Sequence, residues 1–246
     1  FMEGGPARRQ FVDRMVYGFD AEHARRLATY EQAMRGRQRL LRDNVGDSAW
    51  LSAEEETMAA TGVALAAARR EVVARLDAAI AEEDNMREAP FPRARLSFEG
   101  EVEGWLDTGP ALEAEDRLRV ALAAGRARDS EAGRALHGAH RSDLIVQHCG
   151  KDMSAALCST GEQKALLIAI VLAHARLLGL ARGAAPVILL DEVAAHLDEG
   201  RRIALAERIL ALGAQAWLTG TDTRLFEAFN GQAQTFEVSS GSVRQI

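Results

Sequence analysis

The feature that most constrains this chain is a short apolar run that ends in two adjacent carboxylates. Residues 187–190 are all aliphatic, and Asp191 and Glu192 follow them directly. A run this short and this apolar predicts a fully buried strand of a parallel sheet. Ligands bind outside the carboxyl ends of such strands. A strand that ends in Asp-Glu is typical of nucleoside-triphosphate hydrolases, where such groups hold Mg²⁺ and polarise water.

A second motif, STGEQ at residues 159–163, stands at the start of a long apolar stretch that predicts a helix. Free backbone N–H groups and the helix dipole favour an anion at a helix start. Gly161 allows close backbone approach or an unusual φ angle, and the Ser159 hydroxyl is predicted to contact a phosphate oxygen. The alternative is an ordinary N-cap formed by Ser159 or Thr160. The two motifs, in this order and one βα unit apart, indicate an ATPase of the ABC type.

The two carboxylates are expected to do different work, because neighbouring strand residues point to opposite sides. We predict that Asp191 holds Mg²⁺ through water and that Glu192 is the general base for the attacking water. The alternative is a strand that happens to end in acids at a solvated turn. The pattern Asp-Glu-x-x-x-x-Leu-Asp continues to Asp198. Asp198 is predicted to form a turn that reaches across a dimer interface.

Two threonines, Thr219 and Thr221, follow another predicted strand at residues 215–219 and are weaker candidates for sensing a γ-phosphate. Transport ATPases usually place a histidine here, so its absence disfavours a membrane-transporter subunit. In a head-to-tail dimer, the turn at residues 159–163 would close over the γ-phosphate held by the other protomer. The predicted nucleotide contacts are Ser159, Thr160, Gly161, Glu162, Gln163, Asp191, Asp198, Thr219 and Thr221.

A complete site of this kind also requires a Gly-x-x-x-x-Gly-Lys-[Ser/Thr] loop, which cradles the phosphates. The 246 residues contain no such loop. The lysines are Lys151 and Lys164, and the surroundings of Lys151 lack both the earlier glycine and the hydroxyl. We therefore expect the phosphate-loop portion to lie upstream of Phe1 in a longer protein.

Composition limits the class of protein and of partner. The chain is 48% hydrophobic and 27% charged, which suits one large or two small globular domains. The two cysteines, Cys149 and Cys158, are expected to be reduced thiols. No stretch looks long enough to span a membrane, so no membrane partner is expected. Three histidines, His137, His140 and His148, match no established zinc spacing.

The net charge of −6 is not that of a strongly basic nucleic-acid binder. A nucleic-acid partner would need a local basic face, for which Arg8 and Arg9 are the first candidates. Arg141 is a third, in a loop where it either pairs with Asp143 or contacts phosphate. The alternative is a solvated helix face balanced by acidic residues. The arginine-rich arm comprises Arg8, Arg9, Arg25, Arg26, Arg35, Arg37, Arg39 and Arg42.

Periodicity divides the chain into a helical lobe at residues 1–92 and an α/β part at residues 93–246. Ser52 and Glu55 form a Ser-x-x-Glu pattern that predicts the start of a long helix. Alternating strands and helices over the last third predict parallel strands. Helices are predicted at 10–17, 22–41, from 52 onward, 112–124, 163–180 and 201–212. Strands are predicted at 95–99, 144–146, 187–190 and 215–219, with a final hairpin around 236–243.

Five segments resemble the bacterial RecF recombination-mediator family, a group of ABC-type ATPases related to SMC-like heads. These are EGGPARRQFVD (3–13), YEQAMRGR (30–37) with leucines at 40 and 41, GAHRSD (138–143), STGEQK (159–164), and LLDEVAAHLD (189–198) with TGTD (219–222). They follow the family's order over nearly the whole chain. Ala139 departs from the family's usual proline.

This resemblance implies the C-terminal part of an ABC-type, SMC-like ATPase head that uses ATP and Mg²⁺. It implies a weak ATPase that is active as a full-length dimer, whereas these 246 residues alone would be inactive. It also implies binding to DNA near single-strand/double-strand junctions, and RecR-like and RecO-like partners that help to load a recombinase. Such a protein would be cytoplasmic and nucleoid-associated. The alternative is a head that binds DNA or partners without ATP turnover.

Overall fold

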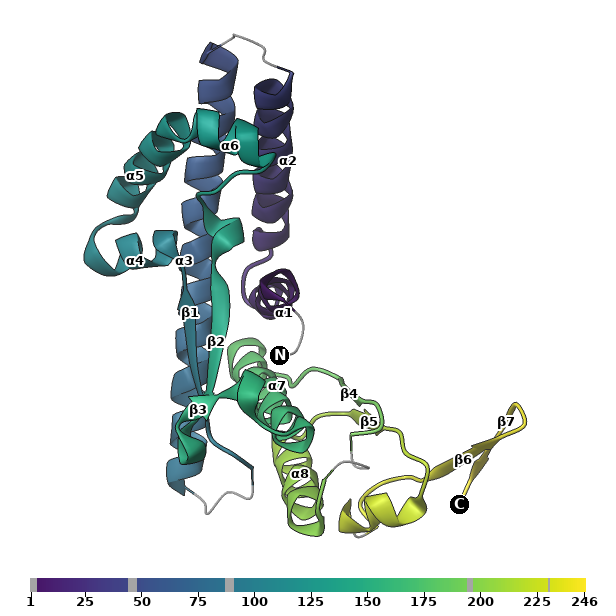
Figure 1. Ribbon diagram of the computed structural model, residues 1–246. Coiled ribbons are helices and arrows are strands. Elements are labelled where there is room, and N and C mark those ends of the chain that lie inside the picture. Colours follow the sequence, from purple (N-terminus) through teal and green to yellow (C-terminus); the bar gives the residue numbers. More distant parts are fainter. Residues whose placement is uncertain (1–3, 44–47, 87–90, 194–196, 230) are drawn as a thin grey trace. The chain divides into compact units, whose positions relative to one another are not determined.

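The computed structural model describes residues 4–43, 48–86, 91–193, 197–229 and 231–246 (Figure 1). Its internal contacts divide the chain into two units. Unit 1 comprises Phe1–Ala79 and Arg95–Gln147, and unit 2 comprises Ile80–Ala94 and His148–Ile246. This division differs from the predicted split after residue 92. The segment from 95 to 147 packs with the N-terminal helices, and a split by position along the chain does not capture that.

Unit 1 is built mainly from helices. The first three are α1 (Gly5–Tyr17), α2 (His23–Arg42) and α3 (Ser48–Met86), whose last residues belong to unit 2. The others are α4 (Glu101–Thr108), α5 (Ala111–Ala124), α6 (Arg126–Ala132) and the short 3-10 turn η1 (Ala139–Arg141). The predictions of α1, α2 and α5 are confirmed. Helices α4 and α6 were not predicted, because segments this short carry too few turns for a periodic pattern.

The predicted start of the long helix at Ser52 is wrong. Helix α3 already includes Ser48, and the Ser52 hydroxyl donates to the Ser48 carbonyl, 2.8 Å away, inside the helix. Glu55, the other half of the predicted capping box, is buried and pairs with Arg37. The Ser-x-x-Glu pattern therefore marks contacts of a helix interior here.

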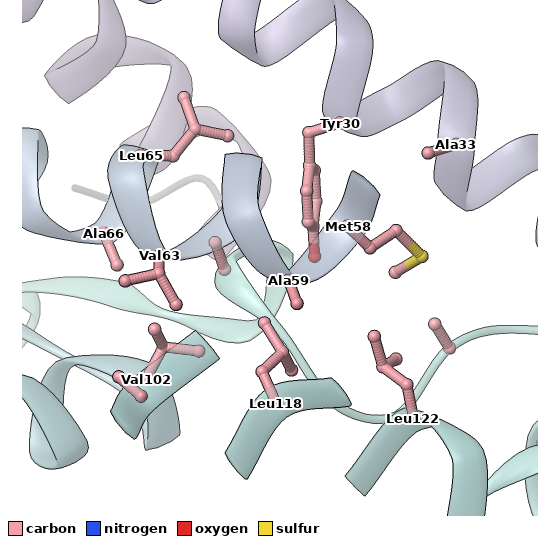
Figure 2. Close-up of a cluster of buried hydrophobic side chains, with 13 residues drawn as sticks. Tyr30, Ala33, Met58, Ala59, Val63, Leu65, Ala66, Val102, Leu118 and Leu122 are labelled. Atoms are coloured by element: carbon pink, nitrogen blue, oxygen red, sulfur yellow. The ribbon is translucent and has the colours of Figure 1, made fainter. Parts of the chain in front are cut away.

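The core of unit 1 lies where α2, α3, α4 and α5 meet (Figure 2). Tyr30 extends from α2 toward α3, and its ring passes Gly62, where an added Cβ would lie 2.9 Å from the ring. Leu118 and Leu122 of α5 face the same cluster and are fully buried. The absence of a side chain at Gly62 thus gives the tyrosine its place between the helices.

A buried ion-pair network crosses this unit. Arg37 of α2 is 1% exposed and donates to Glu55 (2.9 Å), to Asp129 (2.7 Å) and to the Leu122 carbonyl (2.6 Å). Arg126 forms a second pair with Glu55. Arg37 therefore cannot belong to a solvent-facing basic surface, although the sequence placed it in the arginine-rich arm.

One sheet consists of three strands in the order β1 (Ala94–Glu99), β2 (Asp143–His148) and β3 (Met153–Ser154). Two short 3-10 turns, η2 (Cys149–Lys151) and η3 (Ala155–Leu157), flank β3. The Leu96 amide donates to the Asp77 carboxylate of α3, 2.7 Å away. The strands predicted at 95–99 and 144–146 are confirmed; the first is longer by one residue at its start, and the second by one residue at its start and two at its end.

Unit 2 contains the α/β elements of the last third. They are α7 (Thr160–Arg182), β4 (Ile188–Leu190), α8 (Glu199–Leu212), β5 (Ala216–Leu218), η5 (Thr223–Phe229) and the strands β6 (Phe236–Ser239) and β7 (Ser242–Gln245). Strands β4 and β5 pair in parallel, and β6 and β7 form an antiparallel hairpin. Both pairings confirm the sequence prediction.

Strand β4 is not fully buried as predicted. Ile188 and Leu190 are buried, but Leu189 is 75% exposed. Its neighbour in register on β5, Trp217, is 55% exposed. Successive side chains of a strand point to opposite faces. An apolar run therefore predicts a strand with two apolar faces. Among the residues that the structure describes, one of these two faces of β4 packs on the core of unit 2.

Helix α7 is an exception to the expectation that no stretch is long enough to span a membrane. By length and composition it could cross a membrane, with a mean hydropathy of 1.8 over an 18-residue window. Half of that window is buried within the protein. Ala165, Ile168 and Leu172 of this helix belong to the core cluster of unit 2. The apolar character of α7 is thus explained by its place in the core.

Candidate functional site

The carboxyl edge of β4 brings three of the predicted site residues together. The Thr219 amide donates to the Leu190 carbonyl (3.1 Å), which continues the β4–β5 pairing by one residue. The Thr219 hydroxyl donates to Asp191 Oδ1 and accepts the Glu192 amide, 3.0 Å away. One hydroxyl therefore links the side chain of Asp191, the predicted metal ligand, to the backbone of Glu192, the predicted general base.

Glu192 has a strained backbone. Its φ is +49°, in the left-handed region that residues other than glycine rarely adopt. Such a conformation costs on the order of 1 kcal/mol and persists where surrounding contacts impose it, often at functional sites. The hydrogen bond from its amide to Thr219 is one such contact. Asp191 and Glu192 are both exposed, as a group that acts on a bound ligand requires.

The predicted role of Thr219 in sensing a γ-phosphate stays a prediction. Its hydroxyl is engaged with Asp191 Oδ1 and with the Glu192 amide, so it also orients the Asp191 carboxylate and the Glu192 backbone. Sequence reasoning missed this role, although a threonine at the end of the neighbouring parallel strand was the available signal. Thr221 is exposed, in the bend that follows β5. Its role as a phosphate sensor stays a prediction.

Asp198 begins α8. Its Oδ1 accepts the Arg201 amide at 2.9 Å, and its Oδ2 lies 3.4 Å from Arg201 Nε. This is an N-cap, in which a carboxylate satisfies a free amide at the helix start. The side chain is 63% exposed. The predicted contact of Asp198 across a dimer interface stays a prediction. The neighbouring His196 lies outside the described residues.

The start of α7 is a complete capping box. Ser159 Oγ accepts the Glu162 amide (3.4 Å) and donates to Glu162 Oε2 (2.9 Å), while the Ser159 amide donates to the same carboxylate oxygen (3.1 Å). The N-cap that the sequence offered as an alternative is therefore present. Gly161 is helical, so it has no unusual φ. An added Cβ at Gly161 would meet nothing within 4 Å, which leaves room for close approach from outside.

Two neighbours of Ser159 hold this turn in shape. Lys151 Nζ lies 2.6 Å from Glu162 Oε1. The Lys151 ammonium, with the hydrogen bonds from Ser159, lowers the pKa of Glu162 to about 2. Gln163 is buried, and its amide donates to the carbonyls of Cys158 (3.0 Å) and Ala156 (3.4 Å). Both side chains shape the turn. Thr160 is exposed and is left to meet a ligand, together with the amides of Thr160 and Gly161, whereas the Glu162 amide is bound to Ser159 Oγ.

The chemistry of the β4 edge fits a magnesium nucleotide. Asp191 and Thr219 offer carboxylate and hydroxyl oxygens, which are the hard ligands that Mg²⁺ prefers. Asp191 Oδ2 makes no hydrogen bond and no ion pair with a described residue, whereas its Oδ1 is held by Thr219. Among the residues that the structure describes, no group of three or more His, Cys, Asp or Glu forms a protein-only metal site. Cys149 and Cys158 are free thiols, as expected.

The predicted DNA-contacting arginines have different surroundings in unit 1. Arg8 makes a two-pronged pair with Asp143, with Nε 2.7 Å from Oδ1 and Nη2 2.5 Å from Oδ2. The alternative pairing of Asp143 with Arg141 is therefore wrong. Arg9 donates to the Ser142 carbonyl at 2.7 Å, and Arg141 is exposed.

The parallel β4–β5 pair, its Asp-Glu edge and the capped glycine turn of α7 define the fold class as part of an ABC-type ATPase head. Two solved structures share the fold over 99% of the chain. They are described as the recombination mediator protein RecF-ATPrS and RecF-ATP in the RecFOR pathway. Their TM-scores are 0.81 and 0.79 at 20% and 19% identity, and the chain covers 64% of each.

Curated relatives identify the family. The DNA replication and repair protein RecF of Mesorhizobium japonicum is 52% identical over 97% of this chain. The protein of the same name from Brucella abortus is 52% identical over the whole chain, and that of Rhizobium rhizogenes is 51% identical over 99%. The chain matches proteins of the RecF family over its whole length. It spans 63–64% of the length of these relatives. No family model matches the chain.

Proposed function

We propose that this chain is part of an ATP-dependent DNA-binding protein of recombinational repair and replication-gap recovery. In this proposal two heads dimerise on ATP, and the protein acts at single-strand/double-strand DNA junctions with RecR-like and RecO-like partners to load a recombinase. The support is 52% identity over the whole chain to proteins named DNA replication and repair protein RecF. A cytoplasmic, nucleoid-associated location follows from the same proposal.

The observation that carries the ATPase part is the hydroxyl of Thr219, which holds Asp191 and the backbone of Glu192 at one strand edge. Asp191 would bind Mg²⁺ through its solvent-facing oxygen, and the metal would supply charge stabilisation at the transferring phosphoryl group. Glu192 would accept a proton from the attacking water at its exposed carboxylate. Replacement of Glu192 by glutamine tests this assignment.

The turn at the start of α7 would contribute the second half of the site. Its free backbone N–H groups and helix dipole favour the γ-phosphate held by another protomer. Lys151 offsets the charge of Glu162, which would otherwise repel that phosphate. ATP would thus hold two heads together through this turn, and hydrolysis would release them.

Gly161→Ala tests this contact without harming the protomer. An added Cβ meets nothing within 4 Å, and alanine is the better helix former, so the midpoint of thermal unfolding should stay the same or rise. The methyl group would instead stand between the backbone and a phosphate. We expect ATP-dependent dimerisation of the full-length protein to weaken about 10-fold, a loss of ~1.4 kcal/mol.

Sedimentation of the full-length protein with and without ATP measures this effect. Gly104→Ala is the matched control, because Gly104 is an exposed glycine of helix α4 whose added Cβ also meets nothing within 4 Å. The control should dimerise like the wild type. An unchanged dimer affinity of Gly161→Ala would argue against the phosphate contact at this turn.

Thr219→Val should lower ATP turnover and raise the Mg²⁺ concentration needed for half-maximal activity. Valine keeps the shape of the side chain but removes the hydroxyl that orients Asp191 and the Glu192 amide. Residues that orient metal ligands typically contribute about 10–100-fold in metal affinity or activity. Thr219→Ser restores the hydroxyl and should recover most of the activity. Equal loss in both variants would contradict the orienting role.

A further inference from the structure

Segment 138–143 (GAHRSD) of unit 1 has an unusual distribution of contacts. It holds the turn η1 and lies between α6 and β2. Five of its six residues are tied to the interior of unit 1 by their side chain, by their backbone or by close packing. The sixth residue, Arg141, has no such tie to the interior of unit 1. The contacts that fix this segment come from α1, α2, α3, α4 and the residue Ala135.

The first half of the segment is fixed by Tyr30 and Arg69. Gly138 has a φ of +124°, and an added Cβ there would lie 2.4 Å from the Tyr30 hydroxyl, so both conformation and space require glycine. The Ala139 carbonyl accepts Arg69 Nη1 at 2.8 Å. His140 Nδ1 lies 2.7 Å from the Tyr30 hydroxyl. His140 Nε2 lies 3.0 Å from the Ala135 carbonyl, which can only accept, so Nε2 carries the proton.

The second half is fixed by α1 and α4. Ser142 Oγ donates to Glu103 Oε2 at 2.6 Å, and its carbonyl accepts Arg9 Nη1 at 2.7 Å. Asp143 takes the two-pronged pair with Arg8. Ser142 is 1% exposed and Glu103 is 2% exposed, so the hydrogen bond between them is shielded from water. Hydrogen bonds in such an environment are stronger than on the surface.

Arg141 is the exception. Its amide donates to the Gly138 carbonyl at 2.9 Å, which closes the turn, but its guanidinium is exposed. Within the part of the chain that the structure describes, this guanidinium has no hydrogen bond and no ion pair. The backbone that carries it is therefore held rigidly while its charged group faces solvent. Rigid presentation reduces the entropy lost when such a group binds a ligand.

The charges around Arg141 favour an anion. Arg8 is neutralised by Asp143, and Arg69 by Asp13 at 2.7 Å. Arg9 and Arg141 have no carboxylate partner among the described residues. Burial lowers the pKa of Arg9, the positive charges of Arg69 and Arg141 lower it further, and the carboxylates of Asp143 and Asp13 act in the opposite direction. The positive charges of Arg9 and Arg141 thus reinforce each other at one place on unit 1.

We propose that Arg141, supported by the charge of Arg9, binds a phosphate of the DNA backbone, and that segment 138–143 is the rigid scaffold that presents it. A mononucleotide is the other source of such a phosphate. Small ligands of that kind bind in concave pockets, and Arg141 does not line either of two cavities, of about 490 and 720 Å³, found among the described residues. An exposed, planar guanidinium suits an extended phosphate backbone. This inference rests on the proposed function, because it names the group that holds the DNA.

Fluorescence anisotropy with a labelled duplex that carries a single-stranded tail tests the proposal in the full-length protein. Arg141→Ala should weaken binding about 10-fold at low salt, equally for DNA of different sequences, and should reduce the slope of log affinity against log salt by about 1. Arg141→Lys should keep most of the salt slope, because it retains the charge. Arg134→Ala removes an exposed arginine elsewhere in unit 1 and should change the affinity less than about 2-fold.

Titration with a fluorescent ATP analogue, followed in parallel, distinguishes the two phosphate sources. Arg141→Ala should bind it like the wild type. Loss of nucleotide affinity with unchanged DNA affinity would overturn the assignment to DNA. If the wild type binds DNA and Arg141→Ala binds it equally with the same salt slope, the inference fails alone. If the wild type does not bind DNA at all, the proposed function fails with it.

Discussion

Glu192→Gln is expected to lower ATP turnover of the full-length protein by about 10²–10³-fold, within the range for loss of a general base. Glutamine has nearly the same shape but cannot accept a proton from water. The backbone at this position should be preserved, because the Glu192 amide, not its side chain, donates to Thr219. ATP-dependent dimers should therefore persist and accumulate.

Single-turnover hydrolysis measures the loss of turnover, and sedimentation with ATP measures whether the dimers persist. Glu207→Gln is the matched control, because Glu207 is an exposed glutamate on α8, away from the strand edge. It should hydrolyse ATP like the wild type. Unchanged turnover in Glu192→Gln would remove the general-base role. A protein that binds DNA but shows no turnover even in the wild type would favour the alternative of a non-catalytic head.

Arg37→Ala is expected to destabilise the protein by about 3–5 kcal/mol, the usual cost of removing one partner from a buried ion pair. The change leaves Glu55 and Asp129, which are 1% and 0% exposed, without their shared cation. Arg126 still contacts Glu55, but the Arg37 contact to Asp129 is lost. For a chain of this size the midpoint of thermal unfolding should fall by roughly 10 °C.

Arg35→Ala is the control on the same helix. Arg35 is 66% exposed and its pair with Glu31 is 3.5 Å long, so the expected change is within about 0.5 kcal/mol. Arg37→Lys keeps the charge but loses the planar fork, and should give an intermediate stability. A thermal midpoint of Arg37→Ala within 2 °C of the wild type would contradict the structural role of this network.

The contrast between Arg35 and Arg37 shows where sequence reasoning about charge reaches its limit. Both arginines lie on α2 and both were placed in one basic arm. An α-helix completes one turn every 3.6 residues, so side chains two positions apart point in different directions. Which direction leads to the core depends on where α3 and α6 pack, and these partners come from distant parts of the chain. A charge count along the sequence cannot include that information.

The candidate site was predicted more completely, because its signals are local. The parallel pairing of β4 and β5, the capped start of α7 and the exposed acids at positions 191 and 192 follow from patterns within short windows. The partner of Asp191 did not follow. The Thr219 hydroxyl reaches it because β5 lies beside β4, 28 positions further along the chain.

The sequence by itself determined the helices with clear periodicity, the βαβ unit and the family of the chain, because each is encoded in neighbouring residues. Only the tertiary structure decided that Arg37 is buried and that Leu189 and Trp217 face solvent on one side of their strands. It also decided that Arg141 is exposed in a segment whose other residues are held by contacts with unit 1. Burial is a property of the three-dimensional surroundings. Two identical side chains acquire opposite roles when one meets carboxylates inside the protein and the other meets water.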